Sequence, residues 1–139
     1  MLIARDFLSP VATKDQAGTL RPPADLLASS LIHDEHPTGW AAWLRSAGVE
    51  PNGTWRGSNF SDCDLVLAAA EWPGVALGSL FLATPSLTLG LLVQPYDHVL
   101  DAGRGWYAIS TQDRLRDVDV LRTWDWLRRQ ATSASLADS

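Results

Sequence analysis

Residues 73–95 contain no charged side chain, although 19% of the whole chain is charged. A membrane-spanning helix needs about 20 consecutive, predominantly apolar residues. Here Pro73, Gly78, Pro85 and Gly90 interrupt the run, with serines and threonines between them. This punctuation favours short buried strands and turns over a membrane span. We therefore expect this stretch to supply part of the core of a globular domain.

The composition narrows the class of protein further. A length of 139 residues with 46% hydrophobic residues fits one domain with a single core. The net charge of −5 argues against a free-standing nucleic-acid binder, which needs a basic face. The single cysteine, Cys63, excludes a disulfide framework and a multi-cysteine metal site. It also indicates a reducing compartment, so we expect a cytoplasmic protein without a membrane anchor.

Strand and helix patterns alternate along the chain. Helices are expected at 24–29, after Thr38, at 80–83 as a single turn, and from Asp117 to Ala131. Strands are expected at 3–13, 75–77, 90–95 and 106–111. Within the first of these, Pro10 favours an edge strand or a bend. Alternating strands and helices predict an α/β fold.

Two helices have clear local signatures. Trp40, Trp43, Leu44 and Ala47 form an i, i+3, i+4, i+7 stripe, and Gly48 follows at the position that closes a helix. We interpret these tryptophans, together with Trp124, as packing and interface residues rather than as a stacking platform. In the last helix, Asp117 is the expected N-cap. The expected buried face of that helix consists of Val120, Leu121, Trp124, Leu127 and Ala131, and residues 132–139 are expected to form a flexible tail.

A third helix is predicted to begin at Ser61. Its hydroxyl can cap the first turn, with Asp64 in the reciprocal capping-box position. Phe60 and Leu65 occupy the positions of a hydrophobic staple. This helix start can also bind an anion, because its first N–H groups are unpaired. The alternative, that these residues only cap the helix, stays open.

Three other patterns suggest chemistry, and each has a simpler explanation. His33-Asp34-Glu35-His36 has the spacing of metal ligands. The alternative function is therefore that of a small metal-dependent enzyme or binding protein. The simpler interpretation of this pattern is a solvated turn. Cys63 lies near a helix start but between two aspartates, which favours a structural cysteine. Gly103-Arg104-Gly105 lacks the strand–loop–helix context of a phosphate-binding loop.

Five runs in order carry a resemblance to a known family. They are TGWAAWLRSAGVEP, RGSNFSDCDLVLAAAEWPGVALG, LTLGLLVQPY, GWYAIST and DVLRTWDWLRR. Together they resemble the C-terminal part of the effector-binding domain of LysR-type transcriptional regulators, in the subgroup that includes the glycine-cleavage activator. One departure is Leu91, where that subgroup usually has arginine.

The resemblance implies an α/β fold of the periplasmic-binding-protein type 2 kind. One α/β lobe, at about 3–100, would be complete, and 105–131 would be the returning strand and helix of the other lobe. The partial effector-binding domain would thus cover 1–131. Nothing in the chain matches the family's winged helix-turn-helix, so DNA would be bound only through a segment absent from this chain.

The resemblance also implies a function and a site. The chain would be the ligand-sensing fragment of a regulator, with no catalysis, no cofactor and no metal. Its effector would be a small polar or amino-acid-like metabolite. The implied effector contacts are Asn59, Phe60, Ser61 and Asp62 at the helix start, and Arg5 on the strand that enters the lobe. We further expect a homodimer, because an incomplete lobe leaves apolar surface and a sheet edge uncovered.

Overall fold

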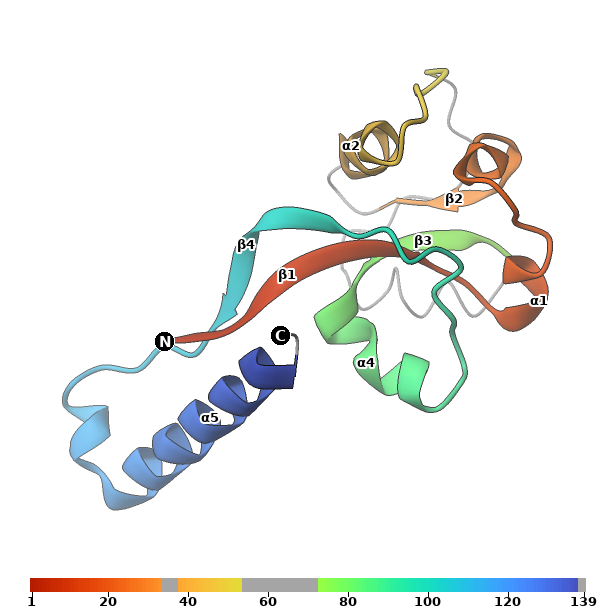
Figure 1. Ribbon diagram of the computed structural model, residues 1–139. Coiled ribbons are helices and arrows are strands. Elements are labelled where there is room, and N and C mark those ends of the chain that lie inside the picture. Colours follow the sequence, from red (N-terminus) through yellow and green to blue (C-terminus); the bar gives the residue numbers. More distant parts are fainter. Residues whose placement is uncertain (34–37, 54–72, 138–139) are drawn as a thin grey trace. The chain divides into compact units, whose positions relative to one another are not determined.

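The computed structural model describes residues 1–33, 38–53 and 73–137. In these ranges the chain is mixed α/β with a four-stranded sheet of order β2-β3-β1-β4, as Figure 1 shows. The strands are β1 (Leu2–Val11), β2 (Leu31–Ile32), β3 (Val75–Ser79) and β4 (Leu100–Tyr107). The helices are α1 (Lys14–Ala17), α2 (Thr38–Ser46), α4 (Leu80–Thr88) and α5 (Val118–Ala137), with 3₁₀ helices η1 (Pro23–Ala28) and η2 (Arg114–Arg116). The predicted α/β fold is confirmed.

The chain divides into two compact units. Unit 2 is continuous, from Phe7 to Leu100, and unit 1 combines Met1–Asp6 with Asp101–Ser139. Strands β1 and β4 each contribute residues to both units. Helices α2 and α4 belong to unit 2, and helix α5 belongs to unit 1.

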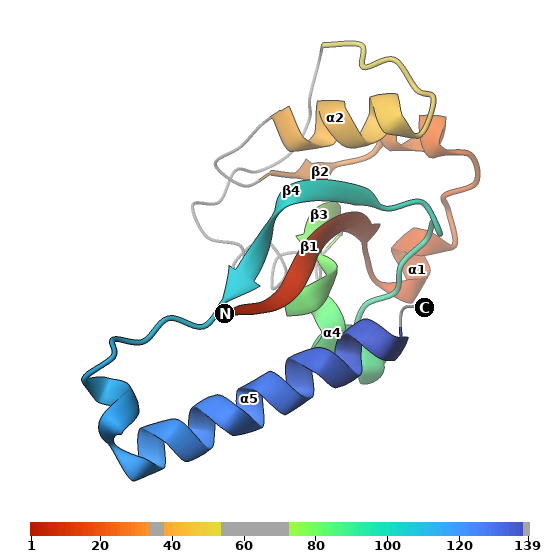
Figure 2. The same cartoon turned by 60° about the vertical axis from the view of Figure 1, so that its left-hand side comes forward.

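Unit 2 buries apolar side chains on both faces of its strands. Consecutive strand residues point to opposite faces, and the neighbours Leu31 and Ile32 accordingly belong to different core clusters. One cluster packs under α2 and η1 and the other under α4, and Figures 1 and 2 show α2 and α4 on opposite sides of the strands. The first cluster is Ala12, Leu20, Leu26, Leu31, Trp40, Trp43, Leu44, Val75 and Tyr96. The second is Val11, Ile32, Ala76, Ala83 and Leu92.

Helix α2 follows its sequence pattern closely. Trp40, Trp43 and Leu44 are buried in the first cluster, and Ala47 packs against it. The helix closes at Gly48, whose φ of 82° is the left-handed conformation expected there. The Val49 N–H then donates to the Leu44 carbonyl at 2.8 Å, which pairs a carbonyl that the helix end leaves exposed. The predicted packing role of this stripe is confirmed.

The uncharged stretch forms β3 and α4 rather than a membrane span. No helix within the described ranges is long and apolar enough to cross a membrane. Helix α4 begins at Ser79, whose hydroxyl accepts from the Leu82 N–H. It continues past Pro85 to Thr88, so the predicted single turn at 80–83 is too short. A proline inside a helix costs a hydrogen bond, and packing of Leu87 against the second cluster offsets that cost.

The strand predicted at 90–95 is wrong. The N–H groups of Leu91 and Leu92 both donate to the Ser86 carbonyl at the end of α4, which directs the chain away from the sheet. Only Val93 bridges to a neighbour, exchanging hydrogen bonds of 3.1 and 2.8 Å with Ala12. Apolar side chains alone therefore do not make this segment a strand.

The strand predicted at 106–111 is displaced toward the N-terminus. Strand β4 ends at Tyr107, and Ala108 exchanges two hydrogen bonds of 2.9 Å with Met1 beyond that end. The side chain of Ile109 is 92% exposed. Pairing with β1 thus decides where this strand lies, although 106–111 has the stronger β propensity.

Two smaller expectations concern the first part of the chain. Strand β1 is confirmed, but it lies inside the sheet, so the edge position suggested by Pro10 is wrong; Pro10 is buried opposite Leu77 in β3. Antiparallel pairs alternate between bonded and non-bonded positions, which leaves places for a residue without an N–H.

The helix expected at 24–29 is the 3₁₀ helix η1. Helix α1 was not expected, although Thr13 caps it in the usual way.

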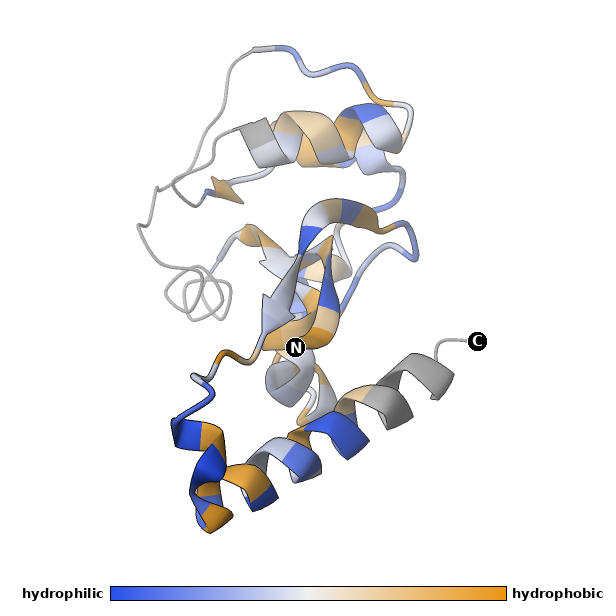
Figure 3. Ribbon diagram, turned by 90° about the vertical axis from the view of Figure 1, so that its left-hand side faces the viewer, coloured by the Kyte–Doolittle hydropathy of each residue, from blue (hydrophilic) through white to orange (hydrophobic). Residues whose placement is uncertain are grey.

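In unit 1, helix α5 begins as predicted. The Asp117 carboxylate accepts from the N–H groups of Asp119 and Val120 at 2.9 and 3.4 Å. Figure 3 shows hydrophilic and hydrophobic residues alternating along the helix. Val120, Trp124, Leu127 and Ala131 of the predicted face are partly buried, whereas Leu121 is exposed. The helix continues to Ala137, so the predicted end at Ala131 is wrong.

Candidate functional site

Four of the five predicted effector contacts belong to a stretch of the chain that the structure does not describe. Asn59, Phe60, Ser61 and Asp62 lie outside the described residues, together with Cys63, so the predicted helix start there remains a prediction. The fifth contact, Arg5, lies on β1 in unit 1. The described part of the candidate site therefore consists of the charged residues on β1 and β4.

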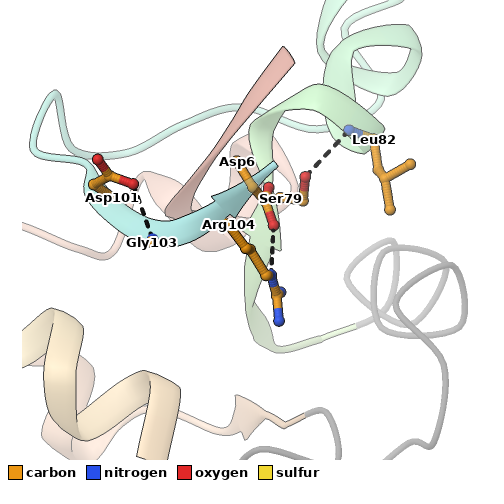
Figure 4. Close-up of polar contacts among 6 residues, drawn as sticks. All are labelled: Asp6, Ser79, Leu82, Asp101, Gly103 and Arg104. Carbon is orange, nitrogen blue, oxygen red and sulfur yellow. Dashed lines mark hydrogen bonds and ion pairs between the residues drawn. The ribbon is translucent and has the colours of Figure 1, made fainter. Parts of the chain in front are cut away.

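Arg5 forms an ion pair with Asp101 of β4. Both side chains are substantially exposed, at 64% and 39%, so water screens the pair and it contributes little to stability. Asp101 also accepts from the Gly103 N–H at 2.9 Å, as drawn in Figure 4. Arg5 is thus a surface residue whose charge is already partly balanced.

A second pair lies at the next residue along β1. Asp6 is 1% exposed, and its Oδ2 atom accepts from Nε of Arg104 at 2.9 Å, as Figure 4 shows. Its other oxygen, Oδ1, is buried and has no hydrogen-bond partner among the residues that the structure describes. Buried carboxylates are usually fully paired, because leaving a polar atom unpaired in the interior is costly. Neither residue was predicted as a site residue; the signal in the sequence was the acidic Asp6, which follows Arg5 in a strand whose other residues are mostly apolar.

The glycines beside Arg104 serve the strand. A Cβ atom on Gly105 would lie 2.6 Å from Leu2 Cδ1 and 2.9 Å from the Ala4 carbonyl, so only glycine allows β4 this close to β1. Gly103 has a φ of 67°, which turns the backbone just before Arg104. The structure places Gly103-Arg104-Gly105 within β4, in agreement with the expectation that it is no phosphate-binding loop.

The alternative metal site is represented by His33 alone, since Asp34, Glu35 and His36 lie outside the described residues. The His33 side chain is buried, at 5% exposure, immediately after β2. Among the residues that the structure describes, no group of three histidine, cysteine, aspartate or glutamate side chains could hold a metal ion. Whether the whole pattern His33-Asp34-Glu35-His36 binds a metal ion therefore stays a prediction.

One contact resembles the nucleophile and base of a hydrolase. Ser46 Oγ lies 2.7 Å from His98 Nε2, but it also donates to the Trp43 carbonyl at 2.7 Å. A hydroxyl has one proton to donate, so His98 Nε2 must be the donor to Ser46. A histidine that donates to the serine is not placed to take its proton. This pair therefore has a structural role at the end of α2.

The same region contains Tyr96, a titratable group whose pKa is shifted. Burial in the first core cluster raises the pKa of Tyr96, and the nearby Asp25 carboxylate raises it further. The phenol donates to the Pro22 carbonyl at 3.2 Å, which requires its neutral form. Its ring lies 5.6 Å from that of Trp43, centroid to centroid. Tyr96 is thus held as a neutral core residue.

Comparison with known proteins gives a consistent family match. The sequence model of the family described as the LysR substrate binding domain matches residues 2–132. The chain is 32% identical to the transcriptional activator AmpR of Enterobacter cloacae over 101 residues, which are 71% of this chain and 35% of that protein. It is 31% identical to the glycine cleavage system transcriptional activator of Escherichia coli K12 over 108 residues, 76% of this chain and 35% of that protein. The chain thus spans about a third of the length of these relatives.

Solved structures show the same fold. The AmpR effector binding domain of Citrobacter freundii is similar, with a TM-score of 0.68 and 26% identity, covering 73% of this chain and 52% of that one. The effector domain of AmpR of Pseudomonas aeruginosa has a TM-score of 0.78 over 99% of this chain and 68% of that one. At 20% identity, this second likeness concerns the fold alone. The fold is thus that of LysR effector-binding domains, which is periplasmic-binding-protein-like.

Proposed function

The chain belongs to the LysR substrate-binding-domain family, and from this premise we propose that it binds a small polar or amino-acid-like effector. The observation that carries the proposal is the family match over residues 2–132, together with the structural likeness to an effector binding domain. The relatives are transcriptional regulators rather than enzymes. We accordingly propose no catalysis, and the metal-dependent alternative is not favoured.

The proposed effector contacts are Asn59, Phe60, Ser61 and Asp62, with Arg5 on β1. The first four would offer backbone N–H groups at a helix start, which suit an anionic or polar group of the effector. Arg5 supports the proposal by its exposure and its place on a strand shared by the two units. Its existing pair with Asp101 means that an effector would compete with that carboxylate.

We also propose how the two units correspond to the family's lobes. Unit 2 would be the second lobe, and the segment Asp101–Ser139 of unit 1 would be the returning part of the first lobe. The flexible tail predicted at 132–139 does not begin at 132, because helix α5 continues to Ala137. DNA recognition would need a helix-turn-helix, which no part of this sequence resembles, and the protein would act in the cytoplasm.

A thermal-shift screen with amino acids and small carboxylates tests effector binding. A ligand at 100 times its Kd stabilises the folded state by about 2.7 kcal/mol, which should raise Tm by roughly 5–10 °C in a chain of this size. Asn59→Ala should reduce that rise, whereas Asn52→Ala in an exposed turn should retain it. A Tm that stays constant across the panel would refute effector binding.

The same proposal includes a homodimer. Val118, Leu121 and Trp126 on α5 are 61%, 44% and 53% exposed, and large exposed apolar side chains favour association. Light scattering at tens of micromolar should give twice the chain mass of 15.1 kDa. A monomer mass at that concentration would contradict the dimer but leave effector binding intact.

A further inference from the structure

The pair formed by Asp6 and Arg104 differs from the other ion pairs in the described part of the chain. The others have carboxylates that are between 39% and 93% exposed, whereas that of Asp6 is 1% exposed. Placing one charged partner in the interior has a desolvation cost, and an apolar residue would often be at least as stable there. The pair therefore invites an explanation other than stability.

The pairing leaves most of the guanidinium available. Asp6 contacts Arg104 through Nε alone, and the arginine makes no other ion pair or hydrogen bond with the residues that the structure describes. The side chain of Arg104 is 49% exposed, and Figure 4 shows its terminal nitrogens extending past the Asp6 carboxylate. Arginine has five N–H donors in a rigid plane, so four of them remain on Nη1 and Nη2.

The position of this guanidinium is fixed by its surroundings. Asp6 is buried and holds Nε at 2.9 Å, while the turn at Gly103 and the close approach at Gly105 fix the backbone on either side. A preorganised guanidinium binds a carboxylate through two parallel hydrogen bonds with a smaller loss of side-chain entropy than a free one.

We propose that Arg104 binds the carboxylate of the effector through Nη1 and Nη2, and that Asp6 is the positioning residue that aims it. This inference rests on the proposed function, and it names the class of ligand as a small monocarboxylate. The two parallel donors support a carboxylate, and the charge argues against a doubly charged ligand. Because Asp6 already balances Arg104 and Asp101 balances Arg5, a phosphate dianion would meet little net positive charge.

The experiment measures binding of glycine, L-alanine, acetate and inorganic phosphate by calorimetry and thermal shift. Arg104→Gln alone would leave the buried Asp6 carboxylate without its positively charged partner, and this loss can unfold the chain. The informative variant is therefore the double substitution Asp6→Asn with Arg104→Gln, which keeps a neutral hydrogen-bonded pair. It should weaken binding of the best monocarboxylate at least about tenfold.

Arg45 and Glu50 provide the matched control, because Arg45 also pairs through Nε, at 3.5 Å, but with an exposed carboxylate. The double substitution Arg45→Gln with Glu50→Gln should leave affinity unchanged. Asp6→Asn alone should retain most of the binding, since its amide oxygen still accepts from Nε, whereas Asp6→Ala should lose it. This rescue separates positioning from a general loss of stability.

The outcomes distinguish the two proposals. Undiminished affinity in the folded Asp6→Asn, Arg104→Gln variant would overturn the role of Arg104 and leave effector binding standing. Tighter binding of phosphate than of any monocarboxylate would overturn the ligand class. A wild-type chain that binds no monocarboxylate of the thermal-shift panel, while a panel compound without a single carboxylate does bind, would refute the monocarboxylate alone; no binding to any compound would refute both proposals.

Discussion

Two buried tryptophans in α2 differ in one polar contact. Trp40 Nε1 donates to the Ile32 carbonyl at 2.9 Å, whereas Trp43 Nε1 is buried and has no partner in the described part of the chain. Replacement by phenylalanine removes part of the ring in either case, but only Trp40→Phe also breaks a buried hydrogen bond. We expect Trp40→Phe to lower the free energy of unfolding by about 1 kcal/mol more than Trp43→Phe. Urea unfolding of both variants measures this difference in the free energy of unfolding. An equal or larger decrease for Trp43→Phe would show that the hydrogen bond from Trp40 to Ile32 does not stabilise the fold.

The raised pKa of Tyr96, caused by burial and by the Asp25 carboxylate, predicts a pH dependence. A group whose folded-state pKa lies above its unfolded value of about 10 stabilises the fold fully below that pH and progressively less above it. The free energy of unfolding should therefore decline as the pH rises from about 10 upward. Tyr96→Phe should flatten this decline, whereas Tyr107→Phe, at a residue 61% exposed, should not. Denaturant titrations across this range check the prediction, and parallel slopes for wild type and Tyr96→Phe would contradict it.

At the scale of elements, the N-cap of α5 offers a similar paired test. The Asp117 carboxylate accepts from two N–H groups of the first turn, whereas Asp113, which precedes η2, makes no such side-chain contact. Asp117→Ala should cost about 1 kcal/mol, and Asp113→Ala should stay within about 0.5 kcal/mol. Helix content by circular dichroism during urea unfolding gives both values. Equal effects would mean that the cap adds nothing to this helix.

Elements with strong local signals could be predicted from the sequence, and elements fixed by distant partners could not. The stripe of α2 with Gly48 and the cap at Asp117 are local patterns, and both are confirmed. Strand β4 contains two glycines, and its position follows from pairing with β1. Helix α4 passes Pro85 because of packing beyond it. The Asp6–Arg104 pair joins residues far apart in the chain, so spacing could not reveal it.

At the scale of the molecule, the apolar core lies within unit 2. Every residue of both core clusters falls between Phe7 and Leu100. Amide exchange is slowest where opening requires disruption of buried packing. Hydrogen exchange should therefore be slower in β3 than in α5, whose exposed face includes Val118 and Trp126. Equal protection in the two elements would indicate that the chain opens only as one cooperative unit.

The division of unit 1 into two separate segments has a consequence for synthesis on the ribosome. Met1–Asp6 emerges first, but its companions begin at Asp101, after all of unit 2 has been translated. At about 5–20 residues per second, the first half of β1 waits roughly 5–20 s for β4. Unit 2 is continuous and can close its own core during that interval, whereas the two segments of unit 1 can pair only after β4 has been made. A pause in translation before Asp101 would leave the buried carboxylate of Asp6 without its arginine.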